Sequence, residues 1–121
     1  MVESSAKVKP WREAVKWAAL EVLGGASPFV GPLDVEATFY LPRPRSHYRT
    51  GKNAHELRDG APSYVSKRPD LDKILRSTFD ALGEAGVWLD DAQVAVLTAV
   101  KCYADRRPPG AVITVRRAVT G

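Results

Sequence analysis

The 121-residue chain contains one cysteine, Cys102, and one methionine. A single cysteine inside a strand-like run excludes a disulfide framework within the chain and a cysteine-based zinc site. Charged residues interrupt every apolar stretch well before the roughly 18 residues that a membrane-spanning helix needs. The first residues also lack the apolar segment of a signal peptide. These absences favour a cytoplasmic protein that does not enter a membrane.

Acidic residues are scarce in one segment. Residues 43–68 contain seven Lys or Arg but only Glu56 and Asp59, whereas the remaining chain holds 11 basic and 12 acidic residues, so the net charge of +4 originates in this segment. Collected positive charge suggests a polyanion partner, because phosphate contacts release condensed counterions. The alternative is a solvated, mobile loop. The side chains that we expect to contact DNA are Arg43, Arg45, Arg49, Lys52, Lys67, Arg68 and Lys73.

Length and periodicity predict a single domain over residues 1–121 with an α+β fold. Residues 11–23 have helical spacing behind Pro10, and residues 33–41 alternate as a half-buried strand. Residues 43–68 have no usable periodicity and predict a long, flexible basic loop. The expected connectivity begins with helix, strand and long loop.

The second half of the chain predicts another helix and two more strands. Asp70 opens a helix whose apolar stripe spans three turns, and Gly83 or Gly86 ends it. A short extended piece at residues 87–89 leads to a strand over 92–104 and, after a turn, a last strand over 111–117. The expected order is therefore helix, strand, long loop, helix, strand, hairpin, strand, forming a small mixed sheet with two main helices.

Four aspartates suggest a metal site. Asp70 and Asp72 occupy the first turn of the second helix, where aspartate also serves as a cap, and Asp90-Asp91 has the alternative role of a turn former. If residues 87–89 pack beside the start of the helix, Asp91 or Asp90 approaches the first pair. Close carboxylates repel one another without a cation, and hard oxygen ligands suit Mg²⁺.

Other side chains near this motif have weaker interpretations. Arg76 lies one turn beyond Asp72, where it can stabilise charge in a transition state or form an ordinary helix salt bridge. His47 and His55 lie in the basic loop and are more typical of polar loop residues or phosphate contacts than of metal ligands. No glycine-rich phosphate loop or recognisable nucleophile motif is present, and we expect no small-molecule cofactor.

Three short motifs resemble the signature of RusA-type crossover-junction endodeoxyribonucleases: Asp-Leu-Asp from Asp70, Phe-Asp-Ala-Leu from Phe79 and Leu-Asp-Asp-Ala-Gln-Val from Leu89. The resemblance implies a homodimeric α+β nuclease of a bacterial or phage-infected cell. Such an enzyme binds Holliday junctions in DNA recombination and repair and cuts them with Mg²⁺, with Mn²⁺ as an alternative. The residues implied as catalytic or metal-binding are Asp70, Asp72 and Asp91, with Asp90 helping to order the metal site and Arg76 in place of the family's lysine.

One departure from the family concerns the N-terminal part. Members usually begin with a strand and a phosphate-contacting loop, whereas here the first helix starts almost at once. We therefore expect that strand and part of the DNA surface to be absent. Two alternatives stay open: a nuclease acting on flaps or forks, and a DNA-binding protein with little or no cleavage. Both faces of the strand over 92–104 are largely apolar, which predicts dimerisation.

Overall fold

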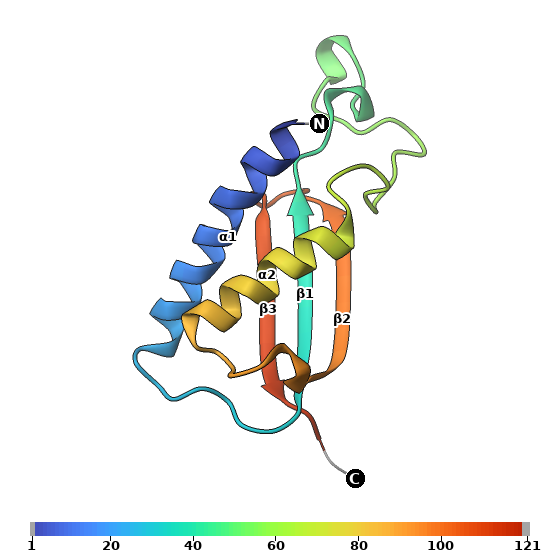
Figure 1. Cartoon of the computed structure of the whole chain (residues 1–121). Coiled ribbons are helices and arrows are strands. Elements are labelled where there is room, and N and C mark those ends of the chain that lie inside the picture. Colours follow the sequence, from blue (N-terminus) through green and yellow to red (C-terminus); the bar gives the residue numbers. More distant parts are fainter. Residues whose placement is uncertain (1, 120–121) are drawn as a thin grey trace.

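The computed structural model describes the backbone of residues 2–119 and the side chains of residues 11–119. Its helices and strands follow the order α1 (Val2–Leu23), β1 (Leu33–Leu41), α2 (Leu71–Ala85), β2 (Val94–Tyr103) and β3 (Gly110–Arg117). Both helices lie on one face of a three-stranded sheet (Figure 1). The expected α+β fold with a small mixed sheet is confirmed.

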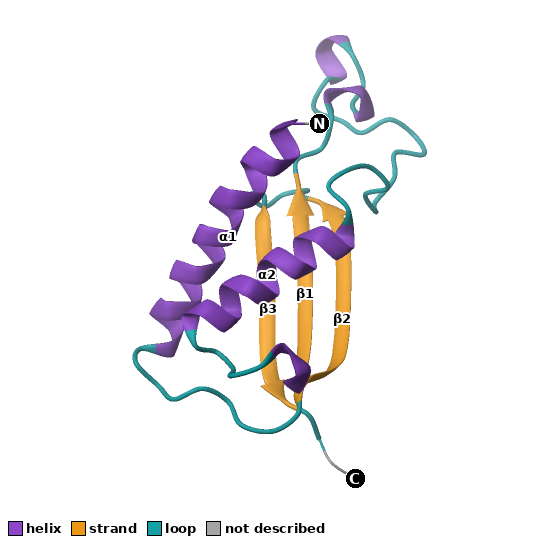
Figure 2. Cartoon of the chain, in the orientation of Figure 1, coloured by secondary structure: helices purple, strands orange, loops and turns teal. Residues whose placement is uncertain are grey.

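The strand that comes first in the sequence is central in the sheet. β1 pairs in parallel with β2 on one side and antiparallel with β3 on the other (Figure 2). Its alternation sends Leu33, Val35, Ala37 and Phe39 into the core, where all four are at most 1% exposed. Strand alternation of this kind is produced by burial of one face. The predicted bounds of β1 are confirmed. The predicted hairpin of the last two strands is wrong, because β1 lies between β2 and β3 in the sheet.

The core lies between the sheet and the two helices. α2 presents Ile74, Thr78 and Leu82 to it, in the helical spacing predicted from the sequence, and it also buries Ala81. Trp88, 2% exposed, fills the space at the end of α2 and packs edge to face on Phe79 with ring centroids 5.3 Å apart. α1 is joined to α2 by ion pairs of Arg12 with Asp80 and Glu84.

Two predicted boundaries were wrong by more than one residue. The first helix begins at Val2, not beyond Pro10. A proline inside a helix removes one backbone bond, and the residues before it include Glu, Ala and Lys, which favour helix; the prediction gave the proline too much weight. β2 begins at Val94 rather than residue 92, because Asp91–Gln93 form a 3₁₀ turn capped by Asp90.

The sheet face opposite the helices has no covering element among the described residues. In the strand register it presents Thr38, Tyr40, Val96 and Val112, and the two valines are 47% and 45% exposed. Within the described part of the chain, no helix has the length and apolar character required to cross a membrane.

Candidate functional site

Asp70 and Asp72 present their carboxylates at the start of α2. Asp70 is the N-cap residue, with extended φ and ψ of −67° and 137°, but its side chain makes no capping hydrogen bond. The cap role that the sequence also allowed is therefore not the one the side chain performs. Both aspartates and Arg76 are exposed, and Lys73 Nζ lies 3.6 Å from Asp70 Oδ2. Two hard oxygen donors consequently face solvent in one helical turn.

A lysine in β2 holds the segment that leads into this turn. Lys101 Nζ donates to the carbonyl oxygens of Lys67 at 2.7 Å and Pro69 at 2.8 Å. Lys101 pairs with Phe39 in the register and so projects toward the helix side of the sheet. Lys101 was not predicted from the sequence, although it is the one charged residue in β2 and this was the available signal. The lysine fixes the position of the chain immediately before Asp70.

Asp90 and Asp91 lie at the other end of α2. The Asp90 carboxylate accepts from Ala92 N at 2.8 Å, and Gln93 Oε1 accepts from Asp90 N at 3.0 Å. Asp91 Oδ1 accepts from Trp88 Nε1 at 2.8 Å. The buried indole therefore fixes the orientation of an otherwise exposed carboxylate.

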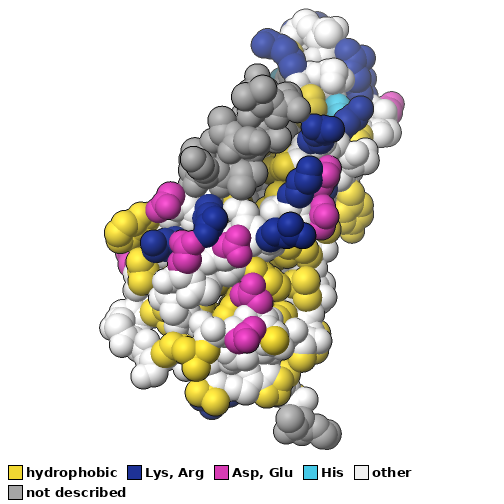
Figure 3. Space-filling view, viewed as in Figure 1, with side chains coloured by type: hydrophobic (Ala, Val, Ile, Leu, Met, Phe, Trp, Pro, Cys, Tyr) yellow, Lys and Arg dark blue, Asp and Glu magenta, His cyan; other side chains and the backbone are white. Residues whose placement is uncertain are grey.

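One copy of the chain does not bring the three aspartates together. A Cβ atom on Gly83 would lie 3.8 Å from Asp91 Oδ1, and at about 1.5 Å rise per residue Gly83 is roughly 20 Å along the axis from Asp70. Among the residues with described side chains, no group of three or more His, Cys, Asp or Glu could hold a metal ion. Figure 3 accordingly shows acidic side chains spread along this face with basic ones between them.

Residues 87–89 do not pack beside the start of α2, so the condition under which Asp91 or Asp90 of the same copy would approach Asp70 and Asp72 is not met. Gly86 takes a left-handed conformation and ends the helix, and Trp88 then forms a parallel bridge with Phe29. Three extended residues span only about 10 Å, so the segment is too short to return along α2. The Asp70–Asp72 pair nevertheless fits a hard cation that keeps open positions for water and phosphate oxygen.

Arg43 is buried at the base of the loop of residues 43–68, with a side chain only 2% exposed. Its Nε and Nη2 donate to both carboxylate oxygens of Asp105, at 2.9 and 2.7 Å, and its Nη1 donates to the carbonyl oxygen of Pro62 at 2.7 Å. Its guanidinium also lies over the ring of Tyr103 and contacts His47. These bonds occupy the donors that a phosphate would need, so the geometry does not support the predicted DNA contact by Arg43.

The Arg43 hydrogen bonds hold the pKa of the Asp105 carboxyl below its ordinary value. The same hydrogen bonds raise the pKa of Arg43. The pair is therefore fully ionised at neutral pH. It joins the start of the loop to the turn between β2 and β3.

The rest of the loop has local structure. It contains 3₁₀ turns at Arg45–His47 and Gly51–Asn53 and a bridge between Tyr48 and Leu57. Arg49 Nη2 bonds Asp59 Oδ1 at 2.9 Å. Within residues 11–119, the loop cations that form no ion pair with a carboxylate are Arg45, Lys52, Arg58, Lys67 and Arg68. That the loop moves as a flexible unit stays a prediction.

Comparison with known proteins identifies the family. The family model described as Endodeoxyribonuclease RusA matches residues 1–116. The chain belongs to the RusA family. Similar proteins include the crossover junction endodeoxyribonucleases RusA of Enterobacteria phage 82 and of Escherichia coli strain K12, each 54% identical to this RusA family member over 35 residues. The aligned stretch covers 29% of this chain and 29% of each relative.

Proposed function

We propose that this RusA family protein is a Mg²⁺-dependent endonuclease that cuts four-way DNA junctions in recombination and repair. The observation that carries the proposal is the exposed Asp70–Asp72 pair at the start of α2 in a member of a nuclease family. Unpaired loop cations supply charge for the DNA backbone. Flap or fork DNA is the alternative substrate for the same chemistry.

Asp70 and Asp72 would hold the metal. When bound, Mg²⁺ (or Mn²⁺) would polarise the scissile phosphate and lower the pKa of a coordinated water. Lys73 and Arg76 follow on the same helix and place positive charge beside the scissile phosphate. Lys67 and Arg68, just before the helix, extend this positive charge along the DNA strand. Lys101 keeps the first carboxylate in position through the Pro69 carbonyl.

A homodimer reconciles the distant Asp91 with a metal site. Asp91 lies near one end of α2 and Asp70 at the other. A two-fold axis crossing near the middle of the helix brings opposite ends of two copies together, so that the partner's Asp91 approaches Asp70 at two equivalent places. Two sites match the paired incisions that a four-way junction needs. Asp90 then orders the turn that presents Asp91.

Exposed apolar side chains favour such a dimer. Leu89, next to Asp90, is 80% exposed, and Val96 and Leu97 on β2 are 47% and 43% exposed. β2 is also an edge strand of the sheet, and an apolar edge invites pairing. A standard interface of at least ~1,200 Å² in total would cover these groups.

Mixing variants tests both the residues and the dimer. Asp70→Asn, Asp72→Asn and Asp91→Asn should each abolish cleavage of a four-way junction in Mg²⁺ while junction binding persists. Asp80→Asn is the matched control, because Asp80 lies in α2 away from Asp70 and Asp72 and pairs with Arg12 of α1. A mixture of Asp70→Asn and Asp91→Asn copies should form heterodimers in which one of the two sites has both aspartates intact. These heterodimers should therefore nick the junction.

The outcomes separate the alternatives. Three fully active single variants contradict the aspartate assignment. Inactive single variants whose mixture stays inactive contradict a shared site but not the assignment. Junction binding without cleavage by the unmodified protein indicates a DNA-binding protein, and faster cleavage of a flap or fork changes the substrate but not the chemistry.

A further inference from the structure

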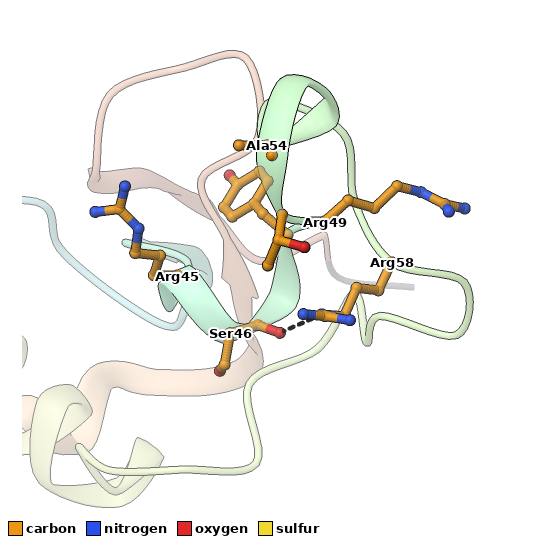
Figure 4. A pocket seen from close by; sticks show the side chains of 8 residues that line it. Arg45, Ser46, Arg49, Ala54 and Arg58 are labelled. Atoms are coloured by element: carbon orange, nitrogen blue, oxygen red, sulfur yellow. Dashed lines mark hydrogen bonds between the residues drawn. The ribbon is translucent and has the colours of Figure 1, made fainter.

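The loop of residues 43–68 contains a pocket that the proposed cleavage chemistry does not use. The hollow has a volume of about 510 Å³, within the range of about 300–1,000 Å³ for small-molecule sites. It is formed by the two 3₁₀ turns and by the later segment of the loop that carries Arg58 (Figure 4). Its lining residues are Arg45, Ser46, Tyr48, Arg49, Thr50, Gly51, Ala54 and Arg58.

The charges around this pocket select an anion. Among residues 11–119, whose side chains the structure describes, no carboxylate lines it. Arg49 is bound to Asp59 at 2.9 Å, and in Figure 4 its side chain extends away from Arg45. Arg58 Nε donates to the carbonyl oxygen of Ser46 at 3.1 Å, which leaves its two terminal nitrogens for a ligand. Arg45 and Arg58 are therefore the cations available to a phosphate.

Tyr48 adds an aromatic surface to the same pocket. Its backbone N–H donates to Arg45 O at 3.0 Å, and it forms a bridge with Leu57. The loop therefore fixes the residue that carries the ring. An aromatic ring beside two unpaired arginines matches the two parts of a nucleotide, since bases stack on aromatic rings and phosphates bind guanidinium groups.

We infer that this pocket holds one unpaired nucleotide of the DNA branch. Its base lies against Tyr48, and Arg45 and Arg58, which lie on opposite sides of the pocket (Figure 4), bind the two phosphates that flank the nucleotide. The inference rests on the proposed function, because a branch point supplies nucleotides that are easily unstacked. Figure 1 shows the loop and the start of α2 at the same end of the molecule, so a strand held in the pocket continues toward Asp70 and Asp72.

A thermodynamic cycle between protein and DNA tests this contact. Four-way junctions would carry an abasic site at each nucleotide flanking the branch, one at a time, and binding would be measured in Ca²⁺ to prevent cleavage. At one position, removal of the base should weaken binding by the unmodified protein about 5- to 150-fold. Tyr48→Leu, which keeps apolar bulk without a π face, should abolish most of that penalty, and Tyr48→Phe should retain it.

Tyr64→Leu is the matched control, because Tyr64 is 70% exposed outside the pocket and should leave the penalty unchanged. Arg45→Gln should weaken binding to intact and abasic junctions by similar factors, since it removes a phosphate contact. A penalty of equal size in Tyr48→Leu and the unmodified protein overturns the inference alone. An unmodified protein that binds the junction no better than linear duplex overturns both the inference and the proposed function.

Discussion

Arg43→Met and Asp105→Ala remove opposite members of the same ion pair, and their costs should differ. Removal of Arg43 leaves a carboxylate that is 44% exposed and regains water, so the free energy of unfolding should fall by about 2 kcal/mol, near one charged hydrogen bond. Removal of Asp105 leaves the Arg43 side chain, which is only 2% exposed, without its counter-charge, and removal of one partner of a buried pair costs about 3–5 kcal/mol. The second loss is limited by the cost of opening the loop to hydrate Arg43.

Urea denaturation and hydrogen exchange would measure these changes. Exchange in residues 43–65 should accelerate more than exchange in α2. The control pair is Arg49 and Asp59, which are also 2.9 Å apart but have side chains 43% and 98% exposed; Arg49→Met should cost under about 1 kcal/mol. Equal losses for Arg43→Met and Arg49→Met, or a milder effect of Asp105→Ala than of Arg43→Met, would refute the reasoning.

Acid should weaken the same contact. The pKa of Asp105 is lower than its ordinary value of 3.8 because its carboxylate accepts hydrogen bonds from Arg43. The stabilisation is therefore complete above about pH 4 and is lost as the pH falls through the lowered pKa. The difference in unfolding free energy between the unmodified protein and Asp105→Ala should be constant from pH 5 to 7 and shrink below pH 4.

Four further variants have defined expected results. Gly86→Ala should lower stability by about 1 kcal/mol, because φ at Gly86 is +86°. Gly83→Ala should raise stability by about 0.5–1 kcal/mol, because Gly83 is helical and an added Cβ would meet no atom closer than 3.7 Å. Thermal denaturation of the two variants measures both changes. Gln93→Ala removes hydrogen bonds to two backbone amides and two carbonyls and should cost about 2–3 kcal/mol in urea denaturation. Arg45→Gln with Lys52→Gln should lower the log–log salt slope of DNA binding by about two; an unchanged slope would mean that these charges are merely solvated.

Local patterns predicted most of the fold. The alternation in β1 and the apolar stripe in α2 each arise from burial of one face, and this periodicity is visible in the sequence. The motif around Asp70 also predicted the family, which the match over residues 1–116 confirmed. The order of strands in the sheet is a property of long-range pairing, and no local pattern contained it.

Two features of the site could not be predicted for physical reasons. The distance from Asp70 to Asp91 depends on where α2 ends and how the chain turns at Gly86. The closeness of the two aspartates in the sequence therefore did not place them close together in space. The role of Arg43 depends on Asp105, a turn residue far away in the chain. In the sequence of a basic segment, an arginine that will be buried cannot be distinguished from one that stays solvated until its binding partners are known.

The central position of β1 has a consequence for how the chain acquires its structure. The residues that pair with β1 follow it by about 60 residues in β2 and about 80 in β3, and contacts this distant in sequence slow folding. During synthesis β1 leaves the ribosome early, and both its edges stay unpaired until the loop, α2, β2 and β3 have also emerged. The charged side chains of its outer face, Asp34 and Glu36, reduce the hazard of pairing with another chain during that interval.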